Sequence, residues 1–333
     1  MTHENIDRLF EGFERSKVLV IGDVMIDAYL WGNVDRISPE APVPVVSVSK
    51  RENRLGGAAN VALNIAALGA TPIICAVAGK DDKGKILNEL LEFRGMSNRG
   101  VVFSDERPTT VKSRIISGHQ HIVRVDEEST TPLSKGEETK FLENLSLILE
   151  EEKPDVIIFE DYNKGLLTTN VISNAIEMAN AAGIPTAVDP KKENFFAYKG
   201  VTLFKPNLKE LKEGLKLDFN KKDIYALEQA VQKLEELLGN SMSLITLSEE
   251  GIYVRKAEDK AHIPAHIRKI SDVSGAGDTV ISVAALCLAA NTEIDFMAGL
   301  ANLAGGLVCE KVGVVPIDRD RLRSEAKMHL AQP

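Results

Sequence analysis

Short apolar runs alternate along the chain with longer segments of helical periodicity, and this alternation constrains the fold more than any other feature. The short runs are rich in Val and Ile and lack polar alternation, which is typical of strands covered on both faces. Several of the longer segments stop just before a glycine, the expected end of a helix. The expected strands are Lys17–Ile21, Pro72–Ala78, Asp155–Phe159, Pro185–Val188, Val201–Phe204 and Ser243–Leu247, and the expected helices are Ala58–Leu68, Lys83–Arg94, Lys135–Glu151, Asn170–Ala182 and Lys222–Leu238. This order predicts an α/β fold with a doubly wound, mostly parallel sheet and helices on both faces.

Two stretches interrupt this rhythm, at about residues 28–52 and 108–126. The first holds three prolines within Pro39–Pro44 and then alternating valines. The second has alternating apolar residues on both sides of Gly118. Both patterns favour strands and loops over helices. One interpretation is a small β lid inserted into a single domain that spans residues 1–333, and the other is a pair of ordinary edge hairpins.

The composition disfavours several classes of function. The 333 residues carry a formal net charge of -9, whereas a protein that binds nucleic acid through its phosphates needs a basic face. The three cysteines lie far apart, which disfavours a disulfide framework or a zinc site and fits a reducing compartment. Residues Met1–Arg15 are polar, and the longest nearly apolar run, Val280–Ala290, is too short to cross a bilayer. We therefore expect a cytoplasmic protein that binds neither nucleic acid nor membranes.

The strongest candidate site is the segment Asp272–Thr279, which precedes an apolar helical pattern. Glycines at a helix start let backbone N–H groups approach an anion, and the helix terminus favours negative charge. Gly275, Ala276 and Gly277 would hold the charge that develops on a transferred phosphoryl group. Asp278 falls in the first helical turn, where it would take the proton of an attacking hydroxyl. The alternative is a glycine-rich turn with a helix-capping aspartate.

Further polar residues follow the expected strands, at the edge where such sheets bind their ligands. Asp23 and Asp27 would accept hydrogen bonds from sugar hydroxyls. Gly56 and Gly57 would let the backbone approach a ligand, and the Asn60 amide both donates and accepts. The alternatives are turn formation and close helix packing. The later strands are followed by Glu160, Asp161 and Lys164, by Asp189 and Lys191, and by Lys205, Asn207, Leu208, Lys209 and Glu210.

Asn207 and Glu210 allow two interpretations. Their spacing fits a helix capping box, in which each side chain accepts a hydrogen bond from the backbone of the other. The functional alternative is that they organise Mg²⁺ and its waters near the phosphates of ATP.

Taken together, these motifs resemble the ribokinase family of sugar kinases, also called the PfkB family. The resemblance covers about Lys17 to Ile317 and includes Gly56–Asn60, Gly79-x-Asp81-x-x-Gly84, Asn207-x-x-Glu210 and Asp272–Thr279. Four further segments look more narrowly like the D-glycero-D-manno-heptose 7-phosphate kinases of that family. These segments are Gly22–Gly32, Arg36–Val45, Glu160–Gly165 and Asp189–Lys191.

The resemblance implies a ribokinase-like fold and ATP-dependent phosphorylation of the heptose phosphate at its anomeric hydroxyl, with ATP and Mg²⁺ as cofactors. The product, heptose 1,7-bisphosphate, would serve ADP-heptose and lipopolysaccharide core synthesis. Asp278 corresponds to the catalytic base, Gly275–Gly277 to the anion hole, and Asp27, Gly57 and Asn60 to sugar contacts. The implied nucleotide residues are Asp189, Lys191, Lys205, Asn207, Leu208, Lys209, Glu210, Ser248, Gly251 and Asn302, with Mg²⁺ held by Asn207 and Glu210 through water.

The phosphate already present on such a sugar needs cationic anchors, because guanidinium groups grip phosphate in a bidentate manner. The candidates are Arg36, Lys112, Arg114 and Arg124, and the alternative is that at least half of them are solvated strand residues. The resemblance also implies a homodimer through the lid. The chain lacks a His-x-Gly-His motif, so a kinase half with a pathway link to a nucleotidyltransferase is expected.

Two other functions fit the same motifs. One is a different sugar or nucleoside kinase on the same fold. The other is a non-catalytic sugar or nucleotide sensor, which the presence of both Asp278 and the glycine-rich turn disfavours.

Overall fold

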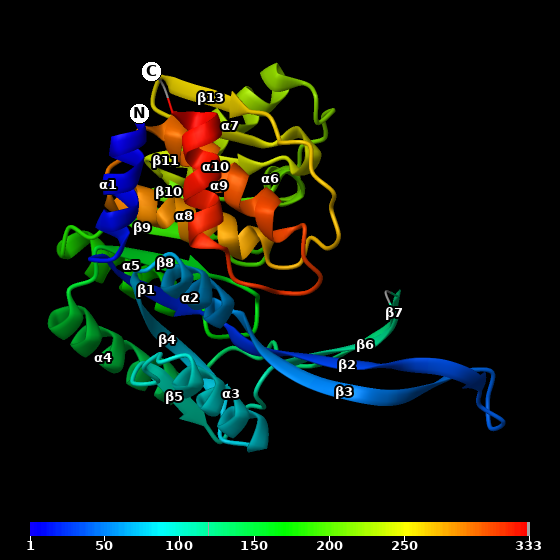
Figure 1. Cartoon of the computed structure of the whole chain (residues 1–333). Coiled ribbons are helices and arrows are strands. Elements are labelled where there is room, and N and C mark those ends of the chain that lie inside the picture. The colour runs from blue at the N-terminus through cyan, green and yellow to red at the C-terminus, as the bar shows by residue number, and fades with distance from the viewer. Residues whose placement is uncertain (119, 332–333) are drawn as a thin grey trace.

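A nine-stranded sheet lies at the centre of the part of the chain that the structure, a computed structural model, describes: residues 1–118 and 120–331 (Figure 1). The strand order is β13-β12-β11-β10-β9-β8-β1-β4-β5. Strands β11 to β5 of this order run parallel, and β12 and β13 add an antiparallel hairpin at one edge. The bounds are β1 Lys17–Gly22, β4 Thr71–Gly79, β5 Val101–Ser104, β8 Val156–Glu160, β9 Thr186–Asp189, β10 Leu203–Phe204, β11 Met242–Thr246, β12 Ile252–Lys256 and β13 Asp259–Ile263.

The parallel strands are apolar throughout because both faces of the sheet are covered. In β1, Val18 and Val20 belong to one hydrophobic core, and Leu19 and Ile21 belong to the other. Since successive side chains of a strand point to opposite faces, each face packs against its own layer of helices. The predicted doubly wound arrangement is therefore confirmed.

The helices divide between these two cores. One core includes residues of α1 (His3–Phe13), α2 (Ala58–Ala67), α3 (Asp82–Phe93), α8 (Ala276–Ala289), α9 (Ile294–Val308) and α10 (Arg319–Leu330). The other core includes residues of α4 (Lys135–Glu152), α5 (Thr169–Ala181), α6 (Leu208–Leu215) and α7 (Ile224–Leu238). Gly69, Gly95 and Gly183, the predicted helix stops, all have positive φ angles, which glycine adopts without a steric penalty.

A second sheet projects from this body, at the lower right of Figure 1. Its order is β3-β2-β6-β7, with β2 at Val24–Ile37, β3 at Pro44–Gly57, β6 at Val111–Ser117 and β7 at Gln120–Glu127. Strands β2 and β6 pair in parallel, so that Ile26–Gly32 lies beside Val111–Ser117. The two stretches that interrupt the sequence rhythm thus form one sheet and not two separate edge hairpins.

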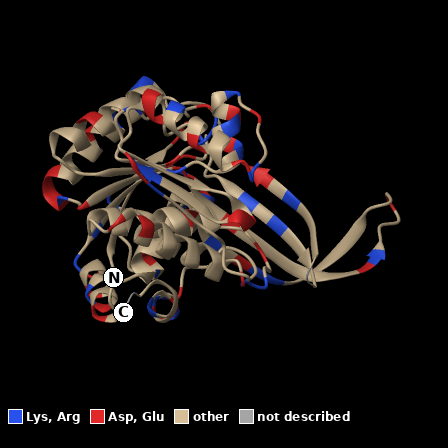
Figure 2. Cartoon of the chain, turned by 90° about the horizontal axis from the view of Figure 1, so that it is seen from above, with Lys and Arg blue, Asp and Glu red and all other residues tan. Residues whose placement is uncertain are grey.

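Some elements depart from the sequence prediction. Only Leu203–Phe204 of the expected strand Val201–Phe204 belongs to the ladder. Helix α9 is buried on nearly all sides and so lacks an amphipathic period, which is why the sequence pattern does not predict it. Among the described residues, no helix has the length and apolar character needed to span a membrane. Acidic and basic residues are interspersed over the body and along the strands of the second sheet (Figure 2).

Candidate active site

The start of α8 opens onto a cavity. Gly275 caps the helix with a φ of 79°, a left-handed conformation that favours glycine. Ala276 and Gly277 line a cavity of about 610 Å³, and Asp278, in the first turn, is buried behind them. The helix start therefore faces open space while its carboxylate lies in a dry environment, which is the arrangement that an anion site with an adjacent base requires.

Helix α2 fixes the position of the Asp278 side chain. The Asn60 amide donates to Asp278 Oδ2 over 2.6 Å. One turn further along α2, Asn64 Oδ1 accepts a hydrogen bond over 3.1 Å from the hydroxyl of Thr279, the next residue of α8, so the two helices are joined twice. Any larger residue at position 275 would crowd this contact, because a Cβ there would lie 3.1 Å from the Asn60 amide nitrogen.

Three carboxylates meet at the ends of β8, β9 and the start of α8. Single oxygens of Glu160, Asp189 and Asp278 all lie within 4.8 Å of one another, and all three residues are buried. Lys205 lies 2.8 Å from Asp189 Oδ2 and is itself only 2% exposed. Burial raises the pKa of Asp278, an effect that the hydrogen bonds from Asn60 and Tyr162 oppose.

Glu160 differs from the other two carboxylates. Among the described residues, neither of its carboxylate oxygens has a hydrogen-bond partner. Burial, with added repulsion from Asp189 and Asp278, raises the pKa of Glu160 well above its ordinary value. An unsatisfied buried carboxylate is costly, so this position suits a ligand that brings its own hydroxyl donors.

Asp23 binds the loop that follows β8. Its carboxylate accepts hydrogen bonds from the backbone N–H groups of Tyr162, Lys164 and Leu166, over 2.9, 3.0 and 3.4 Å. With both oxygens engaged in this way, Asp23 holds the loop in place and does not present a free carboxylate to a sugar. Burial and the nearby Asp161 raise the pKa of Asp23 to about 6.

This pKa predicts how Asp23 affects stability as a function of pH. A carboxyl whose pKa is 3.8 ordinarily and about 6 in the fold binds protons more tightly in the folded state. Its contribution to the free energy of unfolding therefore falls as the pH rises from about 4 to about 6, then stays level. Raising the pKa of Asp23 by about two changes its contribution to the free energy of unfolding by roughly 3 kcal/mol over this range. We expect urea denaturation to show that Asp23→Asn gains stability relative to the wild type across this pH range.

Asp81 provides the control for that measurement. It also accepts hydrogen bonds from backbone N–H groups, those of Gly84 and Thr109, but these bonds lower its pKa, against the opposing effect of burial. Asp81→Asn is therefore expected to lose stability relative to the wild type as the pH rises through the acid range. If the stabilities of Asp23→Asn and Asp81→Asn, each relative to the wild type, changed with pH in the same direction, the raised pKa of Asp23 would be contradicted.

Asp161, also predicted to contact the substrate, faces a different set of partners. Its carboxylate accepts hydrogen bonds from the Asn163 backbone, the Asn194 amide and the Tyr198 hydroxyl, over 2.8, 3.0 and 2.7 Å. The side chain is fully buried in this network. The structure therefore gives Asp161 a supporting role and leaves Glu160, the last residue of β8, as the carboxylate that lies beside Asp278.

Asp27 and Arg114 form an ion pair in the second sheet, β3-β2-β6-β7, which is called the lid sheet from here on. Gly56 packs directly on this pair, because a Cβ there would lie 2.3 Å from Asp27 Oδ2. Tyr29 lies beside them, with the guanidinium groups of Arg54 and Arg114 over its ring at 4.7 and 5.4 Å from the ring centroid. Arg114 thus lies beside Asp27, one of the residues that the sequence predicts to contact the sugar.

The other predicted cations differ in position. Lys112 has its ammonium group over the ring of Tyr162, which places it near Asp278. Lys164 forms an ion pair with Glu128 at 2.8 Å. Arg124 is exposed and bonded to Asp126 on its own strand. Arg36 is exposed near the far end of β2, away from the body, so the structure does not bring it to this site (Figure 1).

Asn207 and Glu210 form the reciprocal capping box of α6. The second oxygen of Glu210 accepts a hydrogen bond from Lys191 at 3.0 Å. Direct binding of a metal ion would compete with these bonds, whereas each oxygen keeps a lone pair for a water of a hydrated ion. The donor set therefore fits Mg²⁺ held through water, the arrangement that the sequence predicts.

The loop Ser248–Gly251, which is predicted to contact the nucleotide, borders the same cavity as the start of α8. Ser248, Gly251 and Asn302 line it together with apolar residues such as Ile252 and Val280. Gly251 has a φ of 92°, and a Cβ there would lie 2.0 Å from the carbonyl oxygen of Ile263. A mostly apolar cavity with a few fixed polar groups is suited to a nucleobase.

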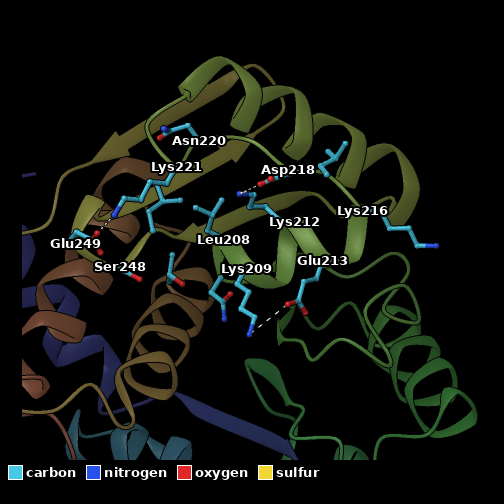
Figure 3. A pocket seen from close by; sticks show the side chains of 14 residues that line it. Leu208, Lys209, Lys212, Glu213, Lys216, Asp218, Asn220, Lys221, Ser248 and Glu249 are labelled. Atoms are coloured by element: carbon cyan, nitrogen blue, oxygen red, sulfur yellow. Dashed lines mark hydrogen bonds and ion pairs between the residues drawn. The ribbon is translucent and has the colours of Figure 1, made fainter.

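A wider cavity of about 1020 Å³ lies between α6 and this loop, and it shares Ser248 and Glu249 with the first cavity. Figure 3 shows three of its four lysines turned toward acidic partners: Lys209 toward Glu213, Lys212 toward Asp218 and Lys221 toward Glu249. The fourth, Lys216, points away from these pairs. Lys209, predicted on the nucleotide side, therefore lies on an open wall of this cavity and is paired with Glu213.

Tyr162 is a site residue that is not among those predicted from the sequence. Its hydroxyl donates to Asp278 Oδ1 over 2.9 Å. The available signal was its place directly after Glu160-Asp161, at the carboxyl end of a parallel strand.

Comparison with known proteins decides the family. The family described as "pfkB family carbohydrate kinase" matches residues 15–320. The chain belongs to this family. Among curated PfkB-related proteins, "Bifunctional protein HldE" of Pelobacter propionicus is 40% identical over 314 residues, which cover 94% of this chain and 64% of the relative. The protein of the same name from Desulfatibacillum aliphaticivorans is 40% identical over 316 residues, which cover 94% of this chain and 63% of the relative.

The chain thus spans a little under two thirds of the length of these relatives. Solved structures support the PfkB fold. Phosphofructokinase-2 from Escherichia coli in complex with potassium has a TM-score of 0.78 at 19% identity, covering 96% of this chain and 99% of that one. Arabidopsis thaliana ribokinase complexed with ribose and ATP has a TM-score of 0.72 at 18% identity, covering 93% and 99%. The predicted ribokinase-like fold is confirmed.

Proposed function

We propose that this PfkB kinase transfers the γ-phosphoryl group of ATP to the anomeric hydroxyl of D-glycero-D-manno-heptose 7-phosphate, which yields heptose 1,7-bisphosphate. The observation that carries the chemistry is the start of α8, where Ala276 and Gly277 line a cavity and Asp278 follows in the first turn. The choice of sugar is supported by the sequence resemblance to heptose 7-phosphate kinases.

In the proposed reaction, the anomeric oxygen attacks the γ-phosphorus and its proton passes to Asp278. The bond between the γ-phosphorus and the bridging oxygen of ADP breaks, and ADP leaves. The N–H groups of Gly275 and Gly277 would donate to the charge that develops on the transferred group. The Ala276 N–H, also predicted to do so, donates to the carbonyl oxygen of Val273 over 3.3 Å. Mg²⁺, held through water by Asn207 and Glu210, would neutralise phosphate charge.

The sugar is proposed to lie between the lid sheet and the central sheet. Glu160 would accept its hydroxyl hydrogens, since both of its oxygens lack a partner among the described residues. Asp27, Gly57 and Asn60 would complete the sugar contacts from the ends of β2, β3 and α2. Of the predicted lid cations, Lys112 lies over Tyr162 and Arg114 is paired with Asp27, and we propose these two as the anchors of the 7-phosphate.

Lys112→Met is expected to raise the KM for the sugar phosphate by roughly 10-fold, the order of magnitude of one charge-assisted contact. The KM for ATP should change little. Arg36→Met provides the comparison, because Arg36 is exposed and distant from the body. Steady-state kinetics with each substrate varied in turn measures both constants. A larger effect of Arg36→Met than of Lys112→Met would reverse the assignment.

The proposed assembly and setting follow the same resemblance. We propose that the chain acts as one kinase domain, that two copies pair through the lid sheet, and that the product passes to a nucleotidyltransferase for ADP-heptose and lipopolysaccharide core synthesis. A cytoplasmic location also remains a proposal. Sedimentation with and without the lid tip, residues 38–43, would test the dimer.

A coupled ADP-release assay across sugar phosphates tests the substrate. The panel would include heptose 7-phosphate, fructose 6-phosphate, ribose and adenosine, and phosphorus NMR would locate the new phosphate. We expect the highest kcat/KM with the heptose, phosphorylated at the anomeric position. Preference for fructose 6-phosphate, ribose or adenosine would replace this proposal with another PfkB activity.

A further inference from the structure

Tyr162 occupies a central position among the groups of the candidate site. It lies in the loop after β8 that Asp23 holds through three backbone hydrogen bonds. Its hydroxyl donates to Asp278 Oδ1, while the Asn60 amide donates to Oδ2. Both oxygens of the proposed base are therefore fixed by side chains that approach from different elements.

The ring of Tyr162 has a second set of contacts. The ammonium groups of Lys112, from the lid sheet, and Lys191, from the segment after β9, each lie over this ring at 5.3 Å from its centroid. A cation over an aromatic face is attracted by the ring quadrupole. Lys191 also donates to Glu210, the residue proposed near the ATP phosphates. One side chain thus contacts the base, a lid cation and a cation of the nucleotide side.

We propose that Tyr162 is a positioning residue for phosphoryl transfer. Its hydroxyl orients the Asp278 carboxylate toward the acceptor oxygen, and its ring holds Lys112 on the side of the sugar phosphate and Lys191 on the side of ATP. The proposal rests on Asp278 being the base. A carboxylate oxygen has two lone pairs, so Oδ1 can keep the Tyr162 hydrogen bond and still accept the proton of the sugar hydroxyl.

The surroundings keep the tyrosine a donor. Burial and the charges of Asp278, Glu160 and Asp189 raise the pKa of Tyr162 well above its ordinary value, so its hydroxyl retains its proton. Besides these carboxylates, Lys205, which follows β10, lies near Asp278, Lys191 lies near Glu160, and Lys112 lies over the Tyr162 ring.

Tyr162→Phe separates the hydroxyl from the ring. Loss of a hydrogen bond to a charged group is expected to lower kcat roughly 10- to 100-fold. Both KM values should stay within about threefold, because the ring still holds the two lysines. Tyr162→Leu removes the ring as well, and it should raise the KM for ATP and for the sugar phosphate a further two- to fivefold, roughly the strength of an exposed cation–π contact.

A double-mutant cycle with Asp278→Asn shows whether the hydroxyl acts through the base. In the Asp278→Asn background, adding Tyr162→Phe is expected to change the residual rate by less than about threefold. An equal loss in both backgrounds would overturn the proposal, and so would a Tyr162→Phe enzyme with wild-type kcat. ATP-induced thermal stabilisation of each variant confirms that it is folded.

Tyr198→Phe is the matched control. Tyr198 is also a buried tyrosine that donates to a carboxylate, Asp161, next to Tyr162 in the sequence. Its loss is expected to lower stability while kcat stays within about threefold of the wild type. Equal losses of kcat in Tyr162→Phe and Tyr198→Phe would indicate a general effect on the loop and would refute the positioning role. If Asp278→Asn itself retained activity, the proposed function would fail first, and this outcome is distinct from a failure of Tyr162 alone.

Discussion

Asp278→Asn is expected to lower turnover by roughly 100- to 10,000-fold, the range attributed to a general base. The reason is geometric and chemical. Asparagine can still accept from Tyr162 at Oδ1, but its amide cannot take the proton of the attacking hydroxyl. Substitution of the buried carboxylate also relieves repulsion from Glu160 and Asp189, which lie with it in one cluster. The variant should therefore fold and bind ATP, which thermal stabilisation by ATP would measure.

The control for Asp278→Asn is Asp82→Asn. Asp82 also lies in the first turn of a helix, α3, but its side chain is 90% exposed and is paired with Lys85. Its substitution should leave turnover unchanged. Near-normal turnover of Asp278→Asn, measured as ADP release with the preferred sugar, would end the assignment of the base and with it the proposed mechanism.

Lys205→Met is expected to destabilise the protein by about 3–5 kcal/mol, the usual cost of removing one partner from a buried ion pair. Methionine matches the length of lysine but carries no charge. Asp189 would lose its 2.8 Å ammonium partner, and the cluster of Glu160, Asp189 and Asp278 would lose its buried cation. Of the two lysines that oppose repulsion among the three carboxylates, only the less buried Lys191 would then remain.

The stability lost in Lys205→Met is expected to depend on pH. Loss of the cation should raise the pKa of Glu160 and of Asp278 further, so the folded state would take up protons more readily than the unfolded state. The stability lost in Lys205→Met should therefore recover as the pH falls and the carboxylates are neutralised. Urea denaturation between pH 5 and pH 8 measures this recovery.

Two variants sharpen the test of Lys205. Adding Asp189→Asn to Lys205→Met removes the orphaned charge and should restore part of the lost stability, as expected for coupled neighbours. Lys209→Met, on the open wall of the cavity in Figure 3 with an 82% exposed side chain, should cost little. A Lys205→Met protein as stable as Lys209→Met at pH 7 would show that the carboxylate cluster does not need its cation.

The sequence by itself determined the features that depend on local patterns. Apolar runs without alternation require strands covered on both faces, and β1 contributes to both cores. Glycines before an apolar helix predict an anion-binding helix start, and α8 opens onto a cavity there. The capping box at Asn207 and Glu210 was also visible, because its partners are three residues apart.

Only the tertiary structure decided which polar residues meet. Asn60 and Tyr162 lie 218 and 116 residues from Asp278 in the chain, yet both hydrogen-bond to it. Likewise, the sequence placed Asp23 and Asp161 beside the sugar on equal terms with Glu160, but backbone and side-chain donors engage the first two and leave Glu160 without a partner among the described residues. Residue type and spacing fix what a side chain can do, whereas the neighbours that occupy its hydrogen-bonding groups depend on packing between distant segments.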